Sequence, residues 1–231
     1  MSTISIIIPS YNQAEYLPDA IESAYNQTTP PHEIIVIDDG STDGSLEIAR
    51  QYQFSQLPLI ESPVRVVSQA NKGLPMARNT GIMNATGDYI LPLDADDLLV
   101  ENAIERITHA IIQFNADIVA PSFRCFGKVN QDVILNNFTM EELKQTNRLG
   151  YFSAIRRSAL LEVGGYSPRM KYGYEDYHLW FDLFKRGKTL NVLTDILVMY
   201  RTKDHSMLND AQAHHEELML QIKKDHPTVY G

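Results

Sequence analysis

The segment GDYILPLDADDLL, residues 87–99, constrains the fold more than any other part of the chain. Its first half has the length and apolar content of a buried strand, and three of the four residues at 94–97 are aspartates. Carboxylates this close repel one another, so a fold that gathers them at the end of a strand most simply binds a divalent cation through oxygen ligands. The alternative is that Asp96 or Asp97 only caps a helix that begins at Leu98.

A second apolar run also ends in acid. Residues 33–38 are largely β-branched and apolar, and they lead into the segment DDGSTD at 38–43. Predicted strands at 4–8, 33–38, 64–68 and 88–93 alternate with predicted helices at 15–27, 44–52 and 74–84. This alternation predicts a right-handed parallel α/β sheet, in which ligands bind outside the carboxyl ends of the strands. Both acidic segments and the loop Asn71-Lys72-Gly73 are therefore expected at one edge of the sheet.

The second half of the chain has a looser pattern. Residues 127–149 are polar and irregular apart from a short helix at 140–145, and we interpret them as a variable segment. Around them, the hydrophobic pattern predicts strands at 117–126, 151–155 and 191–200, and helices at 100–114, 157–163 and 210–224. Residues 171–176 are predicted to open a further amphipathic helix that continues to about residue 185. Because no linker separates independent units, the whole chain is predicted to be one α/β domain.

Charge and composition exclude several kinds of protein. A formal net charge of −9 argues against a general binder of nucleic-acid backbones, which needs a basic surface. Cys125 is the only cysteine, which excludes an intrachain disulfide and a cysteine-based zinc site and suits a reducing cytoplasm. The chain begins directly with a strand-like run, and no apolar stretch has the length to span a bilayer. We therefore expect a soluble cytoplasmic protein, and a membrane-bound substrate is compatible with it.

Six motifs follow one another in the order and spacing of a known family. They are IPSYN at 8–12, VIDDGSTD at 36–43, NKG at 71–73 with ARNTG at 77–81, LDADD at 93–97, GGY at 164–166, and ED at 175–176 before a Leu-Trp pair. By these motifs, residues 5–206 resemble the inverting glycosyltransferases of family 2. The resemblance implies a GT-A fold, with a Rossmann-like, mainly parallel central sheet flanked by helices in a single domain. It also implies a nucleotide-binding half at 1–97, an acceptor half at 98–205 and a C-terminal helix at 206–231.

The resemblance implies a metal site on the aspartates at 94–97. Sugar transfer expels a nucleoside diphosphate, so a bound cation must neutralise the charge that builds up on the leaving oxygens. The family's Asp-x-Asp motif falls on Asp94 and Asp96, where Mn²⁺ or Mg²⁺ fits the oxygen ligands. Asp96 is the expected direct ligand, and Asp94 is expected to hold the ribose or a metal-bound water. Asp97 is expected to support these groups or to cap a helix, and His205 to complete the metal shell or contact the diphosphate.

The nucleotide needs a stacking face and an edge partner for its base. By resemblance, Pro9 and Tyr11 flank a uracil, and the carboxylate of Asp39 accepts a hydrogen bond from the edge of that base. Lys72 and Arg78 are candidates for contacts with the diphosphate, and a solvated surface charge is the alternative for each. The full predicted set, with Glu15 near the base or ribose, is Pro9, Tyr11, Glu15, Asp39, Lys72, Arg78, Asp94 and Ala95.

The resemblance also assigns a catalytic base. Inversion at the anomeric carbon requires a base opposite the leaving group, to take the proton of the attacking acceptor hydroxyl. This role falls on Asp176, with Glu175 orienting the acceptor. Both acids lie at a predicted helix N-terminus, where the helix dipole favours the ionised carboxylate. The alternative is that they serve only as favourable residues for the start of a helix.

The resemblance implies an enzyme of polysaccharide biosynthesis. It would move a hexosyl or N-acetylhexosaminyl group from a nucleotide-diphosphate sugar, most simply a UDP-sugar, to a hydroxyl of a glycan or lipid-linked acceptor. One alternative is a sugar-1-phosphate nucleotidyltransferase, which would need a glycine-rich basic loop where PSYN stands at 9–12. Another is a non-catalytic module that binds a nucleotide sugar or glycan. We expect a cytoplasmic protein without a nucleic-acid partner, and leave open a peripheral association with the inner membrane face and a homodimer.

Overall fold

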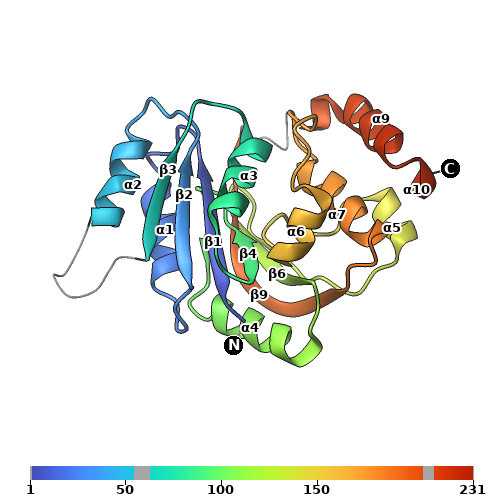
Figure 1. Cartoon of the computed structure of the whole chain (residues 1–231), viewed down its shortest axis with the longest axis horizontal. Coiled ribbons are helices and arrows are strands. Elements are labelled where there is room, and N and C mark those ends of the chain that lie inside the picture. Colours follow the sequence, from blue (N-terminus) through green and yellow to red (C-terminus); the bar gives the residue numbers. More distant parts are fainter. Residues whose placement is uncertain (1, 55–62, 205–210, 231) are drawn as a thin grey trace.

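A mixed β-sheet forms the centre of the molecule (Figure 1). The computed structural model describes residues 2–54, 63–204 and 211–230. Within these ranges the strands lie in the order β3-β2-β1-β4-β8-β6-β9-β5, and β7 pairs with β6 outside this order. The strands are β1 (Ile4–Ser10), β2 (Glu33–Asp38), β3 (Val64–Ser68), β4 (Tyr89–Pro92), β5 (Leu98–Leu99), β6 (Ile118–Gly127), β7 (Gln131–Val133), β8 (Ala154–Arg156) and β9 (Leu190–Thr202).

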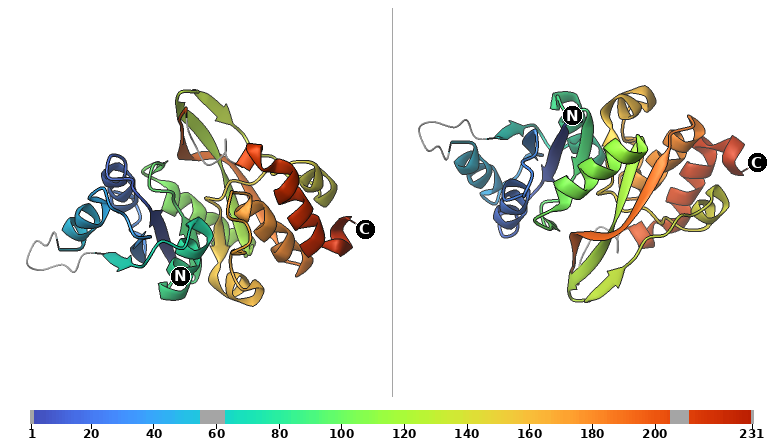
Figure 2. Two further views of the ribbon diagram at one scale, coloured as in Figure 1. Left: turned by 90° about the horizontal axis from the view of Figure 1, so that it is seen from above. Right: turned by 90° about the horizontal axis from the view of Figure 1, so that it is seen from below.

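Helices cover both faces of this sheet (Figures 1 and 2). One apolar cluster contains residues of α1 and α4, and a second contains residues of α3, α6, α7 and α9. The helices are α1 (Leu17–Tyr25), α2 (Ser45–Phe54), α3 (Leu74–Asn84), α4 (Ala103–Phe114), α5 (Met140–Gln145), α6 (Arg157–Val163), α7 (Glu175–Lys185), α9 (His215–Asp225) and α10 (Pro227–Tyr230). The sheet thus separates two hydrophobic cores.

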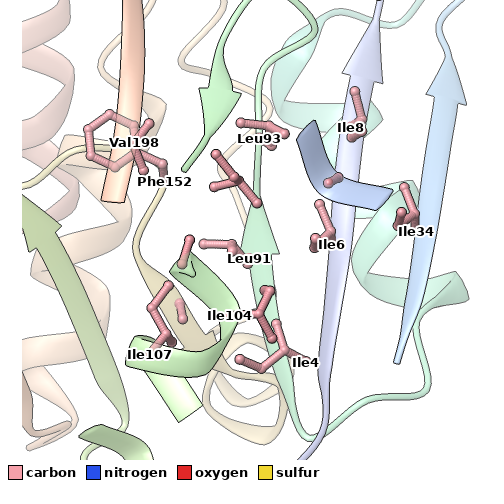
Figure 3. Packing of buried hydrophobic residues seen from close by; sticks show 14 of the residues in the cluster. Ile4, Ile6, Ile8, Ile34, Leu91, Leu93, Ile104, Ile107, Phe152 and Val198 are labelled. Atoms are coloured by element: carbon pink, nitrogen blue, oxygen red, sulfur yellow. The ribbon is translucent and has the colours of Figure 1, made fainter. Parts of the chain in front are cut away.

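Strands β1 and β2 are buried along their whole length. Because successive side chains of a strand point to opposite faces, Ile6 and Ile8 lie in the first cluster and Ile7 lies in the second. Figure 3 shows the first cluster, where Ile104 and Ile107 of α4 lie beside the strand residues. Burial on both faces explains why these strands are continuously apolar rather than alternating.

The predicted single-domain α/β fold is confirmed. Strands β1, β2, β3 and β4 pair in parallel, as the alternation of strands and helices predicted. Beyond β4 the sheet is mixed, because β8 runs antiparallel to both β4 and β6, whereas β6 and β9 run parallel. The parallel arrangement therefore belongs to the N-terminal part of the chain, and the strand direction changes at the pairing of β4 with β8.

Two predicted boundaries are wrong. The helix predicted from residue 100 begins at Ala103, and Leu98–Leu99 instead forms β5, which pairs with Met199 and Val198 of β9. The strand predicted at 151–155 starts only at Ala154. Both errors arise because pairing with a distant strand, which local sequence does not show, decides the conformation of a short apolar run. The predicted C-terminal helix at 210–224 corresponds to α9, and residue 210 lies outside the described residues.

Among the described residues, no helix combines the length and the apolar character that crossing a bilayer would require.

Candidate active site

A buried arginine joins the two acidic motifs. Arg78, in α3, is fully buried, and its Nη2 donates to Oδ1 of Asp94 at 2.7 Å. Its Nη1 donates to Oε1 of Glu175, the first residue of α7. The guanidinium carbon lies 4.6 Å from the ring centre of Tyr151 and 5.3 Å from that of Tyr166, which adds cation–π contacts. One side chain therefore ties the Asp-x-Asp motif to the acidic pair at 175–176.

The surroundings of Arg78 are those of a buried cation. Burial alone would lower the pKa of Arg78, but the charges of Asp94 and Glu175 outweigh burial and raise that pKa well above its usual value. Both terminal nitrogens of Arg78 are used inside the protein, and Glu175 is itself buried. The alternative that Arg78 is a solvated surface charge is therefore wrong, because Arg78 is fully buried. Its contact with a diphosphate and the acceptor-orienting role of Glu175 stay predictions.

The two aspartates of the Asp-x-Asp motif have different partners. Burial raises the pKa of Asp94 to about 6, while Arg78 opposes this shift and the charge of Asp96 adds to it. Oδ2 of Asp96 pairs with Nζ of Lys203 at 2.6 Å. The same ammonium lies 4.6 Å from the ring centre of Tyr16, so an aromatic face and a carboxylate hold it together. Each aspartate is therefore matched by a positive charge from a different part of the chain.

Asp97, the third aspartate of the segment, is held by two hydrogen bonds. Its side chain is buried, and its carboxylate accepts hydrogen bonds from the hydroxyl of Tyr151 and from the backbone N–H of Arg201 at 2.6 Å. Burial and the charges of the two neighbouring aspartates raise the pKa of Asp97 well above its usual value. The alternative that Asp97 caps a helix is wrong, because β5 follows it directly and α4 begins at Ala103. Asp97 instead joins the Asp-x-Asp segment to β9 and to Tyr151.

A buried carboxylate shapes the loop after β3. Oδ1 of Asp39 accepts from Gln69 Nε2 at 2.7 Å and from the backbone N–H of Lys72 at 2.9 Å. Oδ2 of Asp39 accepts from the N–H of Gly73 at 2.8 Å. Gly40, with φ of +78°, approaches this loop so closely that a Cβ there would lie 2.8 Å from the backbone nitrogen of residue 71. Asp39 and Gly40 therefore fix the position of Lys72, whose side chain is exposed.

The remaining predicted nucleotide residues lie at the ends of β1 and β4. Pro9 is buried within β1, and Tyr11, which follows this strand, is 47% exposed. Glu15 is exposed in the same loop, and Ala95 is buried between the two aspartates of the motif. His205 lies outside the described residues. The exposed ring of Tyr11 thus has the accessibility that stacking on a base requires, as the resemblance predicts.

Asp176 lies next to Glu175 and has its own set of partners. Oδ2 of Asp176 accepts from Asn147 Nδ2 at 3.0 Å, and Oδ1 accepts from the N–H of Tyr177 at 2.7 Å. Burial and the charge of Glu175 raise the pKa of Asp176 to about 7, although Arg78 and the two hydrogen bonds oppose this shift. The prediction that the helix N-terminus favours the ionised form does not hold here, because burial outweighs the dipole.

A cavity opens beside the partner of Asp176. It has a volume of about 280 Å³ and is lined by Phe123, by residues 133–136 and by Asn147 and Arg148. Most of these residues belong to the segment 127–149 that the sequence marked as variable. Asn147 therefore contacts both this cavity and Oδ2 of Asp176.

Four residues of the site were not predicted from the sequence. Tyr151 contacts Arg78 and Asp97, Asn147 donates to Asp176, Arg201 donates to Asp97, and Lys203 pairs with Asp96. Tyr151 and Asn147 carry no local signal, because each acts through a partner at least 29 positions away. The segment YRTKD at 200–204, in contrast, places two cations directly after a predicted strand, which could have marked Lys203.

Several known proteins share sequence with this chain. The model of the family described as glycosyl transferase family 2 matches residues 5–178. Glycosyltransferase GlyG of Streptococcus pneumoniae is 36% identical over 145 residues, which are 61% of this chain and 46% of that protein. GlyA of the same species is 35% identical over 125 residues, 54% of this chain and 17% of that protein. TuaG of Bacillus subtilis, provisionally named a teichuronic acid biosynthesis glycosyltransferase, is 28% identical over 215 residues, 88% of this chain and 81% of that protein.

Solved structures share the fold at low sequence identity. Staphylococcus aureus TarS 1–349 in complex with UDP-GlcNAc has a TM-score of 0.75 at 19% identity, over 90% of this chain and 60% of that one. Mannosyltransferase PcManGT from Pyrobaculum calidifontis, in complex with GDP-Man and Mn²⁺, has a TM-score of 0.71 at 18% identity, over 94% of this chain and 63% of that one. The chain spans less than half of the length of GlyA and of GlyG. The predicted GT-A fold is confirmed, and the chain belongs to glycosyl transferase family 2.

Proposed function

We propose that the chain transfers a sugar from a nucleoside-diphosphate donor to a hydroxyl of a glycan or lipid-linked acceptor, with inversion and with a divalent metal. The observation that carries this proposal is the pairing of Arg78 with both Asp94 and Glu175. This pairing fixes the candidate metal motif relative to Asp176, the candidate base. Donor activation and proton removal need such a fixed relation, because the acceptor attacks the sugar from the side opposite the leaving group.

The Asp-x-Asp motif fits a divalent cation. Asp94 uses Oδ1 for Arg78, and Asp96 uses Oδ2 for Lys203. In the described part of the chain, the other oxygen of each carboxylate accepts no hydrogen bond, and the side chains are 25% and 21% exposed. Each aspartate thus keeps one accessible oxygen, the ligand type that Mn²⁺ and Mg²⁺ prefer. The cation would neutralise charge on the leaving diphosphate, with His205 as a further candidate ligand.

The donor would bind at the ends of β1 and β2. Tyr11 offers an exposed ring for stacking, with Pro9, Glu15 and Asp39 nearby in the sequence motifs that the resemblance assigns to the nucleotide. The exposed side chain of Lys72 provides a cation for the diphosphate. Lys203, which pairs with Asp96, provides a second cation for it. We propose a UDP-sugar as the donor. One structural neighbour was solved with UDP-GlcNAc and another with GDP-Man, so the test includes both UDP and GDP.

The acceptor hydroxyl would lose its proton to Asp176. A base works best when its pKa lies near the pH at which it operates, and burial brings the pKa of Asp176 to about 7. The cavity beside Asn147, lined by residues 133–136, is the proposed place for part of the acceptor. We propose a hexosyl or N-acetylhexosaminyl transfer in polysaccharide biosynthesis, carried out in the cytoplasm or at the inner face of the membrane.

A thermal-shift screen with UDP and GDP, each with and without Mn²⁺, tests the donor and metal parts of this proposal. We expect a rise in Tm of several degrees with UDP and Mn²⁺ together, and a much smaller rise with either alone, because the diphosphate and the carboxylates share the cation. Asp96→Asn should lose the metal-dependent part of the rise. Lys203→Met should keep the metal-dependent part and lose only the contribution of one cation to nucleotide binding, since Lys203 pairs with Asp96 without being a metal ligand.

Turnover separates an enzyme from a binding module. The nucleotide that stabilises the protein should also support release of free sugar from its nucleotide-sugar form. Metal-dependent binding without any turnover of UDP- or GDP-sugars would favour a non-catalytic binding module. If no nucleotide raises the Tm in a metal-dependent way, the proposal is wrong.

The pH dependence of kcat tests the role of Asp176. Activity should rise with pH around an apparent pKa near 7, because only the ionised carboxylate accepts a proton. Asn147→Leu should move this midpoint upward by about 0.5–1 unit, since it removes a hydrogen bond that stabilises the ionised form. Asn136→Leu, which alters the same cavity without touching Asp176, is the matched control and should leave the midpoint unchanged. An unchanged midpoint in Asn147→Leu would argue against Asp176 as the titrating base.

A further inference from the structure

Three ligand-type side chains meet where the C-terminal helix packs on α7. His178 and Asp182 lie one turn apart on the same face of α7, and His226 is the residue at which α9 ends. One ligand atom from each of these three residues lies within 4.8 Å of the other two. Nδ1 of His178 is 3.2 Å from Oδ2 of Asp182, and Nδ1 of His226 is 3.7 Å from Oδ1 of the same carboxylate. These distances are close to the spacing of about 3.3 Å between ligands of a tetrahedral ion with bonds near 2.0–2.1 Å.

His226 is buried without a hydrogen-bonding partner. It has 0% exposure, and neither of its ring nitrogens forms a hydrogen bond in the described part of the chain. Buried polar atoms are rarely left unpaired, because each costs about 1–3 kcal/mol. An imidazole that is buried without a hydrogen bond has a ring nitrogen available to a metal ion.

His178 is oriented as a metal-binding histidine usually is. Its Nε2 lies 3.1 Å from Oδ2 of Asp225, which also accepts from Gln221 Nε2 at 2.9 Å and pairs with Arg169 at 3.1 Å. This contact leaves Nδ1 of His178, also unpartnered, directed at Asp182. A carboxylate behind a histidine fixes the ring and raises its basicity toward a metal. Asp225 therefore orients the His178 ring so that Nδ1 is available as a metal ligand.

We propose that His178, Asp182 and His226 form a binding site for a transition-metal ion of the zinc class, separate from the Asp-x-Asp motif. Two imidazoles and one carboxylate suit Zn²⁺ or a similar borderline ion, in contrast to the oxygen-only set at Asp94 and Asp96. The side chain of Asp182 is 30% exposed, so the site is open to solvent at this ligand. The ion would link the end of α9 to the helix that begins with Glu175 and Asp176.

Titration of the metal-stripped full chain with Co²⁺ tests this site. Tetrahedral Co²⁺ with nitrogen ligands absorbs visible light strongly, and the oxygen-only motif at Asp94 and Asp96 should not produce this signal. We expect about one equivalent of Co²⁺ to bind with such a spectrum and to be displaced by Zn²⁺. His226→Gln should lose the absorption and weaken binding at least tenfold, whereas Asp96→Asn should retain both. His109→Gln, an exposed histidine on α4, is the matched control and should behave as the wild type.

A second measurement keeps the test decisive if His226→Gln does not fold. Zn²⁺ at a hundredfold excess over Kd should raise the Tm of the wild type by about 5–10 °C. Asp182→Asn, a change at a partly exposed side chain, should abolish this rise while far-UV circular dichroism stays unchanged. The proposal is overturned if the wild type shows neither the Co²⁺ spectrum nor a Zn²⁺-dependent Tm, or if both persist in Asp182→Asn.

Discussion

Asp176→Asn should reduce sugar transfer by about 10³-fold or more while leaving nucleotide and metal binding intact. General base catalysis contributes about 10²–10⁴-fold, and an amide in this position cannot accept the proton of the acceptor hydroxyl. The amide can still accept the N–H of Tyr177, so the start of α7 should be preserved. Single-turnover rates with a saturating donor measure the loss, and calorimetry with the nucleotide and Mn²⁺ measures the binding. A variant that retains more than a tenth of the wild-type rate would exclude Asp176 as the base.

The same substitution should stabilise the folded protein at alkaline pH. The pKa of Asp176 is about 7 in the folded state against 3.8 as the reference, so the folded state holds this proton more tightly. The free energy of unfolding therefore falls as pH rises from about 4 through 7, and an asparagine avoids this loss. At 1.36 kcal/mol per unit, discounted by half for solvent relaxation, Asp176→Asn gains ~2 kcal/mol at pH 8, or about 4–8 °C in Tm.

The pH dependence distinguishes this effect from a general improvement in packing. At pH 4 the wild-type carboxyl group is protonated in the folded state, so the two proteins should have nearly equal Tm. Asp132→Asn, at an exposed residue of β7 paired with Arg124, is a matched control in which a surface charge is removed. It should change Tm by little at either pH, since exposed ion pairs contribute weakly. Equal Tm values for Asp176→Asn and the wild type at pH 8 would mean that the ionised carboxylate is better solvated than its burial indicates.

The sequence predicted the strand ends and most of the helices, because these depend on local patterns. Helices α3 and α6 have the predicted bounds, α7 ends at Lys185 as predicted, and β2 ends in acid as expected. The partners within the site could not be predicted in the same way. Arg78 stands 97 positions from Glu175, and Asp97 stands 104 positions from Arg201. Such pairs become visible only when the fold brings the segments together.

Burial was the other quantity that the sequence did not reveal. The position of Asp176 at the start of a helix correctly placed it beside a positive dipole, and this favoured a low pKa. The folded chain instead surrounds it with buried groups and places Glu175 beside it, so its pKa is raised. The helix-dipole rule therefore placed Asp176 correctly at the start of the helix but gave the wrong direction for its pKa shift. The shift depends on desolvation, which follows from the three-dimensional packing of α7.

Arg78→Met should be among the most destabilising single changes in the chain. Arg78 is fully buried between Asp94 and Glu175, and removing one partner of a buried ionic group leaves the remaining charges uncompensated. Such changes cost about 3–5 kcal/mol, which corresponds to a fall in Tm of roughly 6–20 °C for a domain of this size. The stability of Arg78→Lys should lie between that of the wild type and that of Arg78→Met, because one ammonium cannot donate to two carboxylates in the fork geometry of a guanidinium. Denaturant unfolding at pH 8 measures both.

A double-mutant cycle decides whether charge pairing or packing causes this loss. Glu175→Gln in the Arg78→Met background removes one of the two unpaired carboxylates, so it should restore part of the stability, whereas in the wild type it should lower stability. The loss in Arg78→Met should also shrink between pH 8 and pH 5, because Asp94, whose pKa burial raises to about 6, then takes up a proton and no longer needs a cation. A loss that is independent of pH and is not relieved by Glu175→Gln would instead mean that Arg78 acts mainly by filling the space between Tyr151 and Tyr166.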